Sequence, residues 1–249
     1  MKAARVLAFF FAVGFFVASD AAAAEAVATG DEAAPEATES RMAVPPKSHR
    51  VTWYAQALAR GAAGINVTYF WSKGHMLRAE TVVSGHKIVT IVRGDRYYAY
   101  DEVNRSGVSI RRTPEAVALD APNRRPFGNE LLILEEQGAE KVSEEDVMGR
   151  PCDVFRVTDS RGRRDLWVTR DELRIPLRVE VYDRSRSTKL YTDYVNWQSG
   201  LAISDDFFVP DPTIDFDVFE FEEYFRHATT KGPAGPVPIL YADLLRGFK

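Results

Sequence analysis

RRDLWVTRDELRIPLRVEVYD, residues 163–183, contains the clearest strand signal in the chain. Apolar residues alternate with charged ones in two short runs, which a polar break separates. Alternation of this kind is typical of β-strands with one solvated face. Pro176 falls near the start of the second run, where a missing amide hydrogen is tolerated. The stretch therefore predicts two neighbouring strands whose charges face solvent and do not form a catalytic site.

The same pattern recurs before and after this stretch. Alternating runs such as INVTYFW, MLRAETVV and KIVTIV follow one another from residue 65 onward, separated by glycine-containing breaks. They predict a mainly β domain of roughly ten to twelve antiparallel strands, in a sheet that must curl or close to protect its edges. Helix formers in residues 114–137 predict one or two helices there, with Asn129 as an N-terminal cap and Gly138 at an end.

Several of the predicted strands are apolar or aromatic on both faces, as in TYFW and RYYAY. A sheet with one solvated face would carry polar residues on that face. We therefore expect either a hydrophobic cavity on the concave side or a concave side covered by the central helices. Ordinary packing of helices on a sheet explains the same pattern, so both interpretations stay open.

The ends of the chain predict export. Residues 1–24 have a positive start, an apolar run and then small residues, which is the order of a secretory signal peptide. Residues 25–48 read as a disordered linker, 49–227 as the folded domain and 228–249 as a Gly/Pro-rich tail. Losing the leader removes Lys2, Arg5 and Asp20, so the net charge moves from −4 to −5. A weakly acidic chain has no electrostatic reason to bind nucleic acid. We expect a soluble periplasmic protein that acts as a monomer.

The sequence contains no arrangement of residues that indicates catalysis. The serine-hydrolase, P-loop and dinucleotide-binding signatures are absent, and the histidines form no metal-binding cluster. Cys152 is the only cysteine, which rules out an intramolecular disulfide and is typical of a small core residue. The aspartates of residues 204–223 lack the spacing of a calcium loop. We expect no enzymatic activity, no metal and no cofactor.

The segment VMGRPCDVFRVTDSRGRRDLWVTRDELRIPLRVEVYD, with the later YVNWQSG and ISDDFFVPD, resembles the periplasmic lipoprotein-carrier superfamily of LolA, LolB and the sensor RseB. The resemblance extends over about residues 51–211 and is clearest after Gly149. It implies an incomplete, strongly curved antiparallel half β-barrel, with helices covering its concave face. It also implies non-covalent binding of lipid or lipoprotein acyl chains in a hydrophobic cavity, for transport across the cell envelope.

Strand alternation then suggests which side chains line such a cavity, although it cannot tell which face is concave. A sensor or interaction protein on the same fold, acting on an inner- or outer-membrane protein through its C-terminal tail, is the alternative function. Leu131, Leu132 and Leu134 are expected on a helical lid. The expected lining residues are Tyr69, Trp71, Ile91, Tyr98, Tyr100, Phe155 and Trp167.

Overall fold

The structure is a computed structural model that describes residues 51–61, 64–118, 120, 125–231 and 235–236. The expected signal peptide (1–24) and linker (25–48) lie outside these residues. Of the expected tail at 228–249, only residues 228–231 and 235–236 are described. The boundaries proposed for these segments therefore stay predictions.

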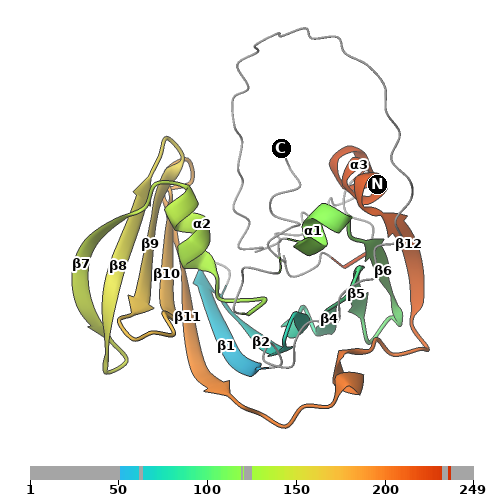
Figure 1. Cartoon of the computed structure of the whole chain (residues 1–249). Coiled ribbons are helices and arrows are strands. Elements are labelled where there is room, and N and C mark those ends of the chain that lie inside the picture. The colour runs from blue at the N-terminus through green and yellow to red at the C-terminus, as the bar shows by residue number, and fades with distance from the viewer. Residues whose placement is uncertain (1–50, 62–63, 119, 121–124, 232–234, 237–249) are drawn as a thin grey trace, which may run out of the picture.

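The described part of the chain is mainly β and forms one sheet of 12 strands (Figure 1). The order across the sheet is β12-β6-β5-β4-β3-β2-β1-β11-β10-β9-β8-β7, so β7 and β12 are its two edges and the sheet stays open. The strands are β1 (Thr52–Gly61), β2 (Gly64–Lys73), β3 (Met76–Val83), β4 (His86–Arg93), β5 (Arg96–Asp101), β6 (Ser106–Arg111), β7 (Glu140–Val147), β8 (Arg150–Thr158), β9 (Gly162–Thr169), β10 (Pro176–Asp183), β11 (Thr188–Ser199) and β12 (Asp215–Glu220).

The expectation of a purely antiparallel sheet is wrong at one edge, where β12 pairs with β6 in parallel. The chain leaves β11 in the middle of the sheet and reaches β12 only after a long connection. A crossover of this kind can deliver a strand in either direction, whereas a tight hairpin permits only an antiparallel neighbour. The sheet is therefore mixed.

The two strands predicted from residues 163–183 are confirmed as β9 and β10, which pair antiparallel with Leu166 opposite Val179. Tight turns connect many of the other neighbours. Between β3 and β4, for example, Ser84 and Gly85 both have positive φ angles, of 52° and 85°. This is the geometry of the two-residue hairpin turn whose twist matches that of the strands.

The prediction of one or two helices in residues 114–137 is confirmed, since α1 (Pro114–Ala118) and α2 (Glu130–Glu136) lie there. The sequence IDFDVFEFEEYF, residues 214–225, alternates and predicts a strand, but the strand ends at Glu220 and a third helix, α3 (Phe221–Lys231), begins there. Phe221, Tyr224 and Phe225 are its buried residues, and their spacing of three and four is that of one helix face. A short 3-10 helix, Asp205–Phe208, precedes β12.

The sheet has two different faces. All three α-helices lie on one side of it (Figure 1), and we call this side the inner face. α2 packs against β8 and β9, and α3 packs against β6 and β12. The main hydrophobic core lies between these helices and the sheet, where the small residues Ala55, Ala79 and Ala99 are fully buried. We call the opposite side the outer face.

None of the helices in the described residues is long and apolar enough to cross a membrane.

Candidate ligand-binding face

Five aromatic side chains meet at the centre of the inner face, and we call them the inner aromatic cluster: Trp53, Phe70, Phe127, Tyr194 and Trp197. Phe127 is the middle of a stack, with ring centroids 5.1 Å from Phe70 and 5.4 Å from Trp197. Trp53 meets Trp197 edge to face at 6.3 Å. Strands β1, β2 and β11 supply four of the rings, and Phe127 comes from the loop before α2. The cluster is therefore closed over by a loop and not by a strand.

That loop, residues 125–129, is a strap that leads into α2, and Arg125 fixes it to the sheet. The Arg125 guanidinium lies 5.2 Å from the Trp197 ring and 5.7 Å from the Trp53 ring, as cation–π contacts. Its nitrogens donate to the carbonyls of Phe127 (3.1 Å) and Gly128 (2.9 Å) within the strap. The side chain is buried, so these contacts replace the water that the charge has lost.

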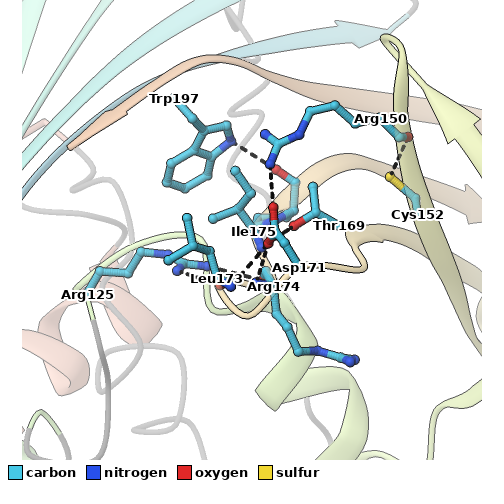
Figure 2. Close-up of polar contacts among 10 residues, drawn as sticks. Arg125, Arg150, Cys152, Thr169, Asp171, Leu173, Arg174, Ile175 and Trp197 are labelled. Atoms are coloured by element: carbon cyan, nitrogen blue, oxygen red, sulfur yellow. Dashed lines mark hydrogen bonds and ion pairs between the residues drawn. The ribbon is translucent and has the colours of Figure 1, made fainter.

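Arg125 also joins the strap to the turn between β9 and β10. Its guanidinium donates to the carbonyls of Leu173 (3.3 Å) and Arg174 (3.4 Å), as Figure 2 shows. Asp171 shapes this turn, because its Oδ1 accepts from the amides of Leu173 and Arg174. The indole of Trp197 donates to the carbonyl of Pro176 at 3.1 Å. The strap, the cluster and the β9–β10 turn therefore form one connected unit.

Gly128 allows the strap to approach Trp197. Its φ angle is +69°, and a Cβ at this position would lie 2.7 Å from Trp197 Cη2. We predict that Gly128→Ala lowers the free energy of unfolding by about 2–4 kcal/mol, because backbone strain adds to overpacking. Urea denaturation of the variant measures this.

Gly138, just after α2, is the matched control for that variant. Its φ angle is +79°, but a Cβ added at this position would meet nothing within 4 Å. Gly138→Ala should therefore show only the backbone cost, about 1–2 kcal/mol. Equal losses for the two variants would mean that the strap does not press against Trp197.

The first residue of α2 adds a buried polar pair to the cluster. The Tyr194 hydroxyl donates to Glu130 Oε1, and the other carboxyl oxygen is buried without a hydrogen-bond partner among the described residues. Burial raises the pKa of Glu130, although the Tyr194 hydroxyl and the Arg125 charge lower it in part. Burial and the nearby carboxylate likewise raise the pKa of Tyr194 well above its ordinary range. Folding therefore shifts both groups toward their neutral forms relative to the unfolded chain.

This pair predicts a pH dependence of stability. A carboxyl with a raised pKa in the folded state binds more protons folded than unfolded, so its contribution to stability falls as pH rises above the ordinary value of 4.5. Glu130→Gln removes the charge and keeps an oxygen for Tyr194. The variant should gain stability relative to the wild type at pH 7, and this gain should shrink as the pH falls toward 4.5.

Thermal unfolding of both proteins across this pH range checks the prediction. Glu135→Gln is the control, because Glu135 is an exposed carboxylate of the same helix. A difference between Glu130→Gln and the wild type that stays constant with pH contradicts the assignment of the proton to Glu130.

α2 covers the sheet beside the cluster, through two of the three leucines expected on a lid. Leu134 is fully buried and Leu131 packs against the core, whereas Leu132 is 44% exposed. α2 covers only a small area of the sheet, because it has only seven residues. The C-terminal end of the helix is tied to β9 by Arg164, whose Nη1 donates to Gln137 Oε1 at 2.5 Å.

The residues expected to line a cavity lie on both faces of the sheet. Phe155 alone packs against the core of the inner face. The others alternate with inner-face residues and point outward, and whether any of them binds a ligand stays a prediction. The outward-facing residues are Tyr69, Trp71, Ile91, Tyr98, Tyr100 and Trp167.

Most of these outward residues already have partners. Tyr98 and Tyr100 pack against Phe216, the second residue of β12, at 5.5 and 5.8 Å. Trp71 meets Phe207 of the 3-10 helix at 5.4 Å. The returning chain after β11 thus covers part of the outer face of β2–β5, which explains why these strands are aromatic on both sides.

The outer face of β8–β11 is charged. Asp165, which is almost fully buried, lies between Arg156 (2.5 Å) and Arg163 (2.9 Å). Asp193 pairs with Arg60 and with Arg178 in the same way. An apolar ligand would have to desolvate these ion pairs without replacing their contacts, which is unfavourable. Of the two faces of this half of the sheet, the inner face is the one that suits an apolar ligand.

The sequence did not predict the inner aromatic cluster, although it predicted the helix, α2, that lies next to the cluster. Strand alternation gives two sets of side chains but does not say which set the helices cover. One usable signal was present, since Ala55, Ala57, Ala79 and Ala99 share the inner face. Small residues in alternate positions mark where another segment approaches a sheet closely. Arg125 and Phe127 lie in a loop without periodicity, so no pattern pointed to them.

Cys152 is a buried free thiol, and burial raises its pKa, so it is a poor nucleophile at neutral pH. It packs with Val147, Ile175 and Leu177 in a small core of its own. In the described parts of the chain, no group of three or more histidine, cysteine or acidic side chains could hold a metal ion.

Comparison with solved structures gives distant similarity in fold. An uncharacterized conserved protein from Thermus thermophilus superposes with a TM-score of 0.50 at 9% identity, over 69% of this chain and 93% of that chain. The complex of MucA and MucB from Pseudomonas aeruginosa gives 0.41 at 13% identity, over 67% and 58% of the two chains. The lipoprotein LppX from Mycobacterium tuberculosis gives 0.38 at 11% identity, over 61% and 89%. A search of curated proteins gives no match.

Comparison with sequence families is more specific. The family described as "Predicted periplasmic protein (DUF2092)" matches residues 71–221, which run from β2 to the start of α3 and include the strap, α2 and most of the inner aromatic cluster. This match spans more than half of the chain. The protein therefore belongs to the DUF2092 family of periplasmic proteins.

Proposed function

We propose that this periplasmic protein binds acyl chains of lipids or lipoproteins, without covalent chemistry, between the inner face of the sheet and the cover formed by the strap and α2. In this role it carries its ligand across the cell envelope and is not an enzyme. The half-barrel shape and the kinship to lipoprotein carriers expected from the sequence belong to the same proposal.

The observation that supports it most is the way in which the inner aromatic cluster is covered. A continuous apolar surface lies beneath a short helix and a loop, and neither of them is hydrogen-bonded into the sheet as a strand. The strap is held by Arg125 and Phe127, and α2 is held by two leucines and by single side-chain hydrogen bonds at its two ends. Such a cover can move away while the 12 strands keep their pairing.

The energies permit such an exchange. Full exposure of one buried leucine costs about 1.5–3 kcal/mol, so displacement of Leu131 and Leu134 costs several kcal/mol. Each methylene of an acyl chain buried in their place contributes roughly 0.8 kcal/mol. A chain that buries about ten methylenes gains roughly 8 kcal/mol, which outweighs the loss of these two leucine contacts. The ligand would therefore take the place of the leucines of α2 while Arg125 keeps the strap in position, and binding would be reversible.

The direct test is lipid binding by the protein purified from the periplasm. Native mass spectrometry and lipid extraction should detect a co-purified lipid, and a fluorescent fatty acid should bind with a saturable signal. Phe70→Ser, which introduces a hydroxyl into the cluster, should weaken probe binding. Tyr69→Ser, next to it on the outer face, is the control and should bind as the wild type does.

The protein would not be a lipid carrier if no lipid co-purified and the probe failed to bind. A partner protein captured only when residues 232–249 are present would then favour the alternative, an envelope sensor or interaction protein. Those residues are described only at positions 235 and 236, so the tail gives no structural argument for either function.

A further inference from the structure

The hairpins of β8–β11 carry opposite charge at their two ends. At one end, the tips 159–164 and 183–189 contain Arg161, Arg163, Arg164, Arg184, Arg186 and Lys189 against Asp159 and Asp183. At the other end, the tips 144–150 and 170–174 contain three arginines against five carboxylates. The first end therefore carries an excess of positive charge, although the whole chain has a net charge of −4. We call residues 159–164 and 183–189 the basic tips.

The two basic tips lie side by side and form one surface. The amide of Arg184 donates to the carbonyl of Arg161 at 2.9 Å, and Asp183 pairs with Gly162 across the two strands. The surface is continuous with α2, because Arg164 of the first tip binds Gln137 at the end of that helix. Glu135 and Glu136, in the last turn of α2, mark its limit on that side.

Part of this positive charge is paired within the protein, since Arg163 and Lys189 both bind Glu180, at 3.1 and 3.0 Å. The charge that remains for a partner lies at the tips of the two turns. Asp159 pairs with Arg164 at 3.0 Å, and Asp159 and Asp183 also shape their own turns, where they accept from the backbone amides of Arg161 and Ser185. Hydrogen bonds from Ser185 and the amide of Arg186 lower the pKa of Asp183. The side chains of Arg161 and Arg184 are exposed and form no ion pair with another described residue. The Arg186 side chain is 71% exposed, with a carboxylate oxygen only at 3.8 Å.

Exposed apolar side chains lie at the same end of the sheet. Neighbouring strands run antiparallel from β10 through β11, β1 and β2 to β3. The ends of β1 and β3 therefore lie at the same end of the sheet as the ends of β8 and β10, where the basic tips are. Strands β2 and β3 carry three exposed aliphatic residues at this end of the sheet. They are Ile65, Val82 and Val83, whose exposed fractions are 69%, 60% and 41%. Exposed cations combined with exposed aliphatic residues are typical of surfaces that bind the interface of an anionic bilayer.

We propose that the basic tips dock this protein onto the surface of a bilayer that contains anionic phospholipids. The cations meet the headgroups, the aliphatic side chains of β2 and β3 reach the acyl boundary, and α2 comes to lie next to the membrane. This docking goes beyond acyl-chain binding and does not depend on it. Together the two would allow a lipid to enter beneath α2 directly from a membrane.

Co-sedimentation of the periplasmic protein with vesicles tests the proposal. Equimolar phosphatidylglycerol and phosphatidylcholine vesicles should bind the protein, more weakly as salt is added, and pure phosphatidylcholine vesicles should bind it far less. Each basic residue near an anionic surface contributes about a fivefold gain in affinity. The triple variant Arg161→Gln, Arg184→Gln, Arg186→Gln should therefore bind the mixed vesicles on the order of 100-fold more weakly.

The matched control is Arg93→Gln, Arg150→Gln, Arg170→Gln, which removes the same charge from the opposite end of the sheet. It should bind the mixed vesicles within about twofold of the wild type, because those residues lie away from the docked surface. Both triple variants should bind a monomeric fluorescent fatty acid as the wild type does. This readout separates docking from acyl-chain binding.

The proposal is overturned by any of three results. The wild type could bind both kinds of vesicle equally or neither of them, the basic-tip variant could bind as the wild type does, or the control variant could lose as much affinity as the basic-tip variant. None of these results bears on the fatty-acid measurement, so the acyl-binding proposal stands or fails separately.

Discussion

Arg125→Ala should lower the free energy of unfolding by about 3–4 kcal/mol, as urea denaturation at neutral pH would measure it. The substitution leaves the carbonyls of Phe127, Gly128, Leu173 and Arg174 without the donor that they share. An unpaired buried polar group costs about 1–3 kcal/mol. The Arg125→Ala substitution also removes the cation that contacts the rings of Trp53 and Trp197.

The control for this variant is Arg93→Ala, an exposed arginine that should change stability by no more than about 0.5 kcal/mol. Arg125→Lys should lie between the two, since an ammonium keeps the charge but cannot reach four carbonyls in one plane. Because Arg125 holds the cover in place, the alanine variant should also take up the fluorescent fatty acid faster. A stability unchanged by Arg125→Ala would contradict the role of this side chain as the anchor of the strap.

Arg112→Ala should cost about 3–5 kcal/mol, because it leaves a buried carboxylate alone. The guanidinium of Arg112 binds both oxygens of Asp120, at 3.0 and 2.9 Å, and also the carbonyls of Gly94 and Ala116. Both side chains of the pair are almost fully buried. The contacts fix α1 to the β4–β5 turn, so urea denaturation should show a large loss.

Replacement of both partners at once is the informative comparison. The double variant Arg112→Met, Asp120→Leu removes both charges and should be more stable than Arg112→Ala, because no buried charge is left without a partner. A double variant that is less stable than the single variant would show that the pair stabilises α1 beyond the mutual neutralisation of its charges.

The sequence predicted the local structure of this protein better than the arrangement of its faces. The alternation in residues 163–183 predicted β9 and β10 correctly, since period-2 patterning depends on one strand at a time. Asn129 was correctly placed before α2, although its side chain donates to the Arg125 carbonyl and does not cap the helix. Local signals of this kind require no knowledge of distant segments.

Two features could not be predicted, because they depend on distant parts of the chain. Strand alternation placed Tyr98 and Tyr100 among the residues expected to line a cavity, but only the return of the chain as Ile214 and Phe216 shows what packs against them. α3 was missed because Phe219 and Phe221 continue an alternating pattern into the first turn of a helix. In both cases the alternation of residues carried no information about which distant segment packs against them.

The four tryptophans offer the most direct test of the central claim, that acyl chains bind on the inner face. Trp53 and Trp197 belong to the inner aromatic cluster, whereas Trp71 and Trp167 lie on the outer face. The variant Trp71→Phe, Trp167→Phe keeps only the inner pair, and the variant Trp53→Phe, Trp197→Phe keeps only the outer pair. Calorimetry with the unbrominated fatty acid first establishes that each variant still binds.

The measurement is the quenching of tryptophan fluorescence by a fatty acid that carries bromine on its chain, because bromine quenches only at close contact. We predict strong, saturable quenching in the protein that keeps Trp53 and Trp197, and little in the protein that keeps Trp71 and Trp167. Quenching confined to Trp71 and Trp167 would place the ligand on the outer face and contradict the account.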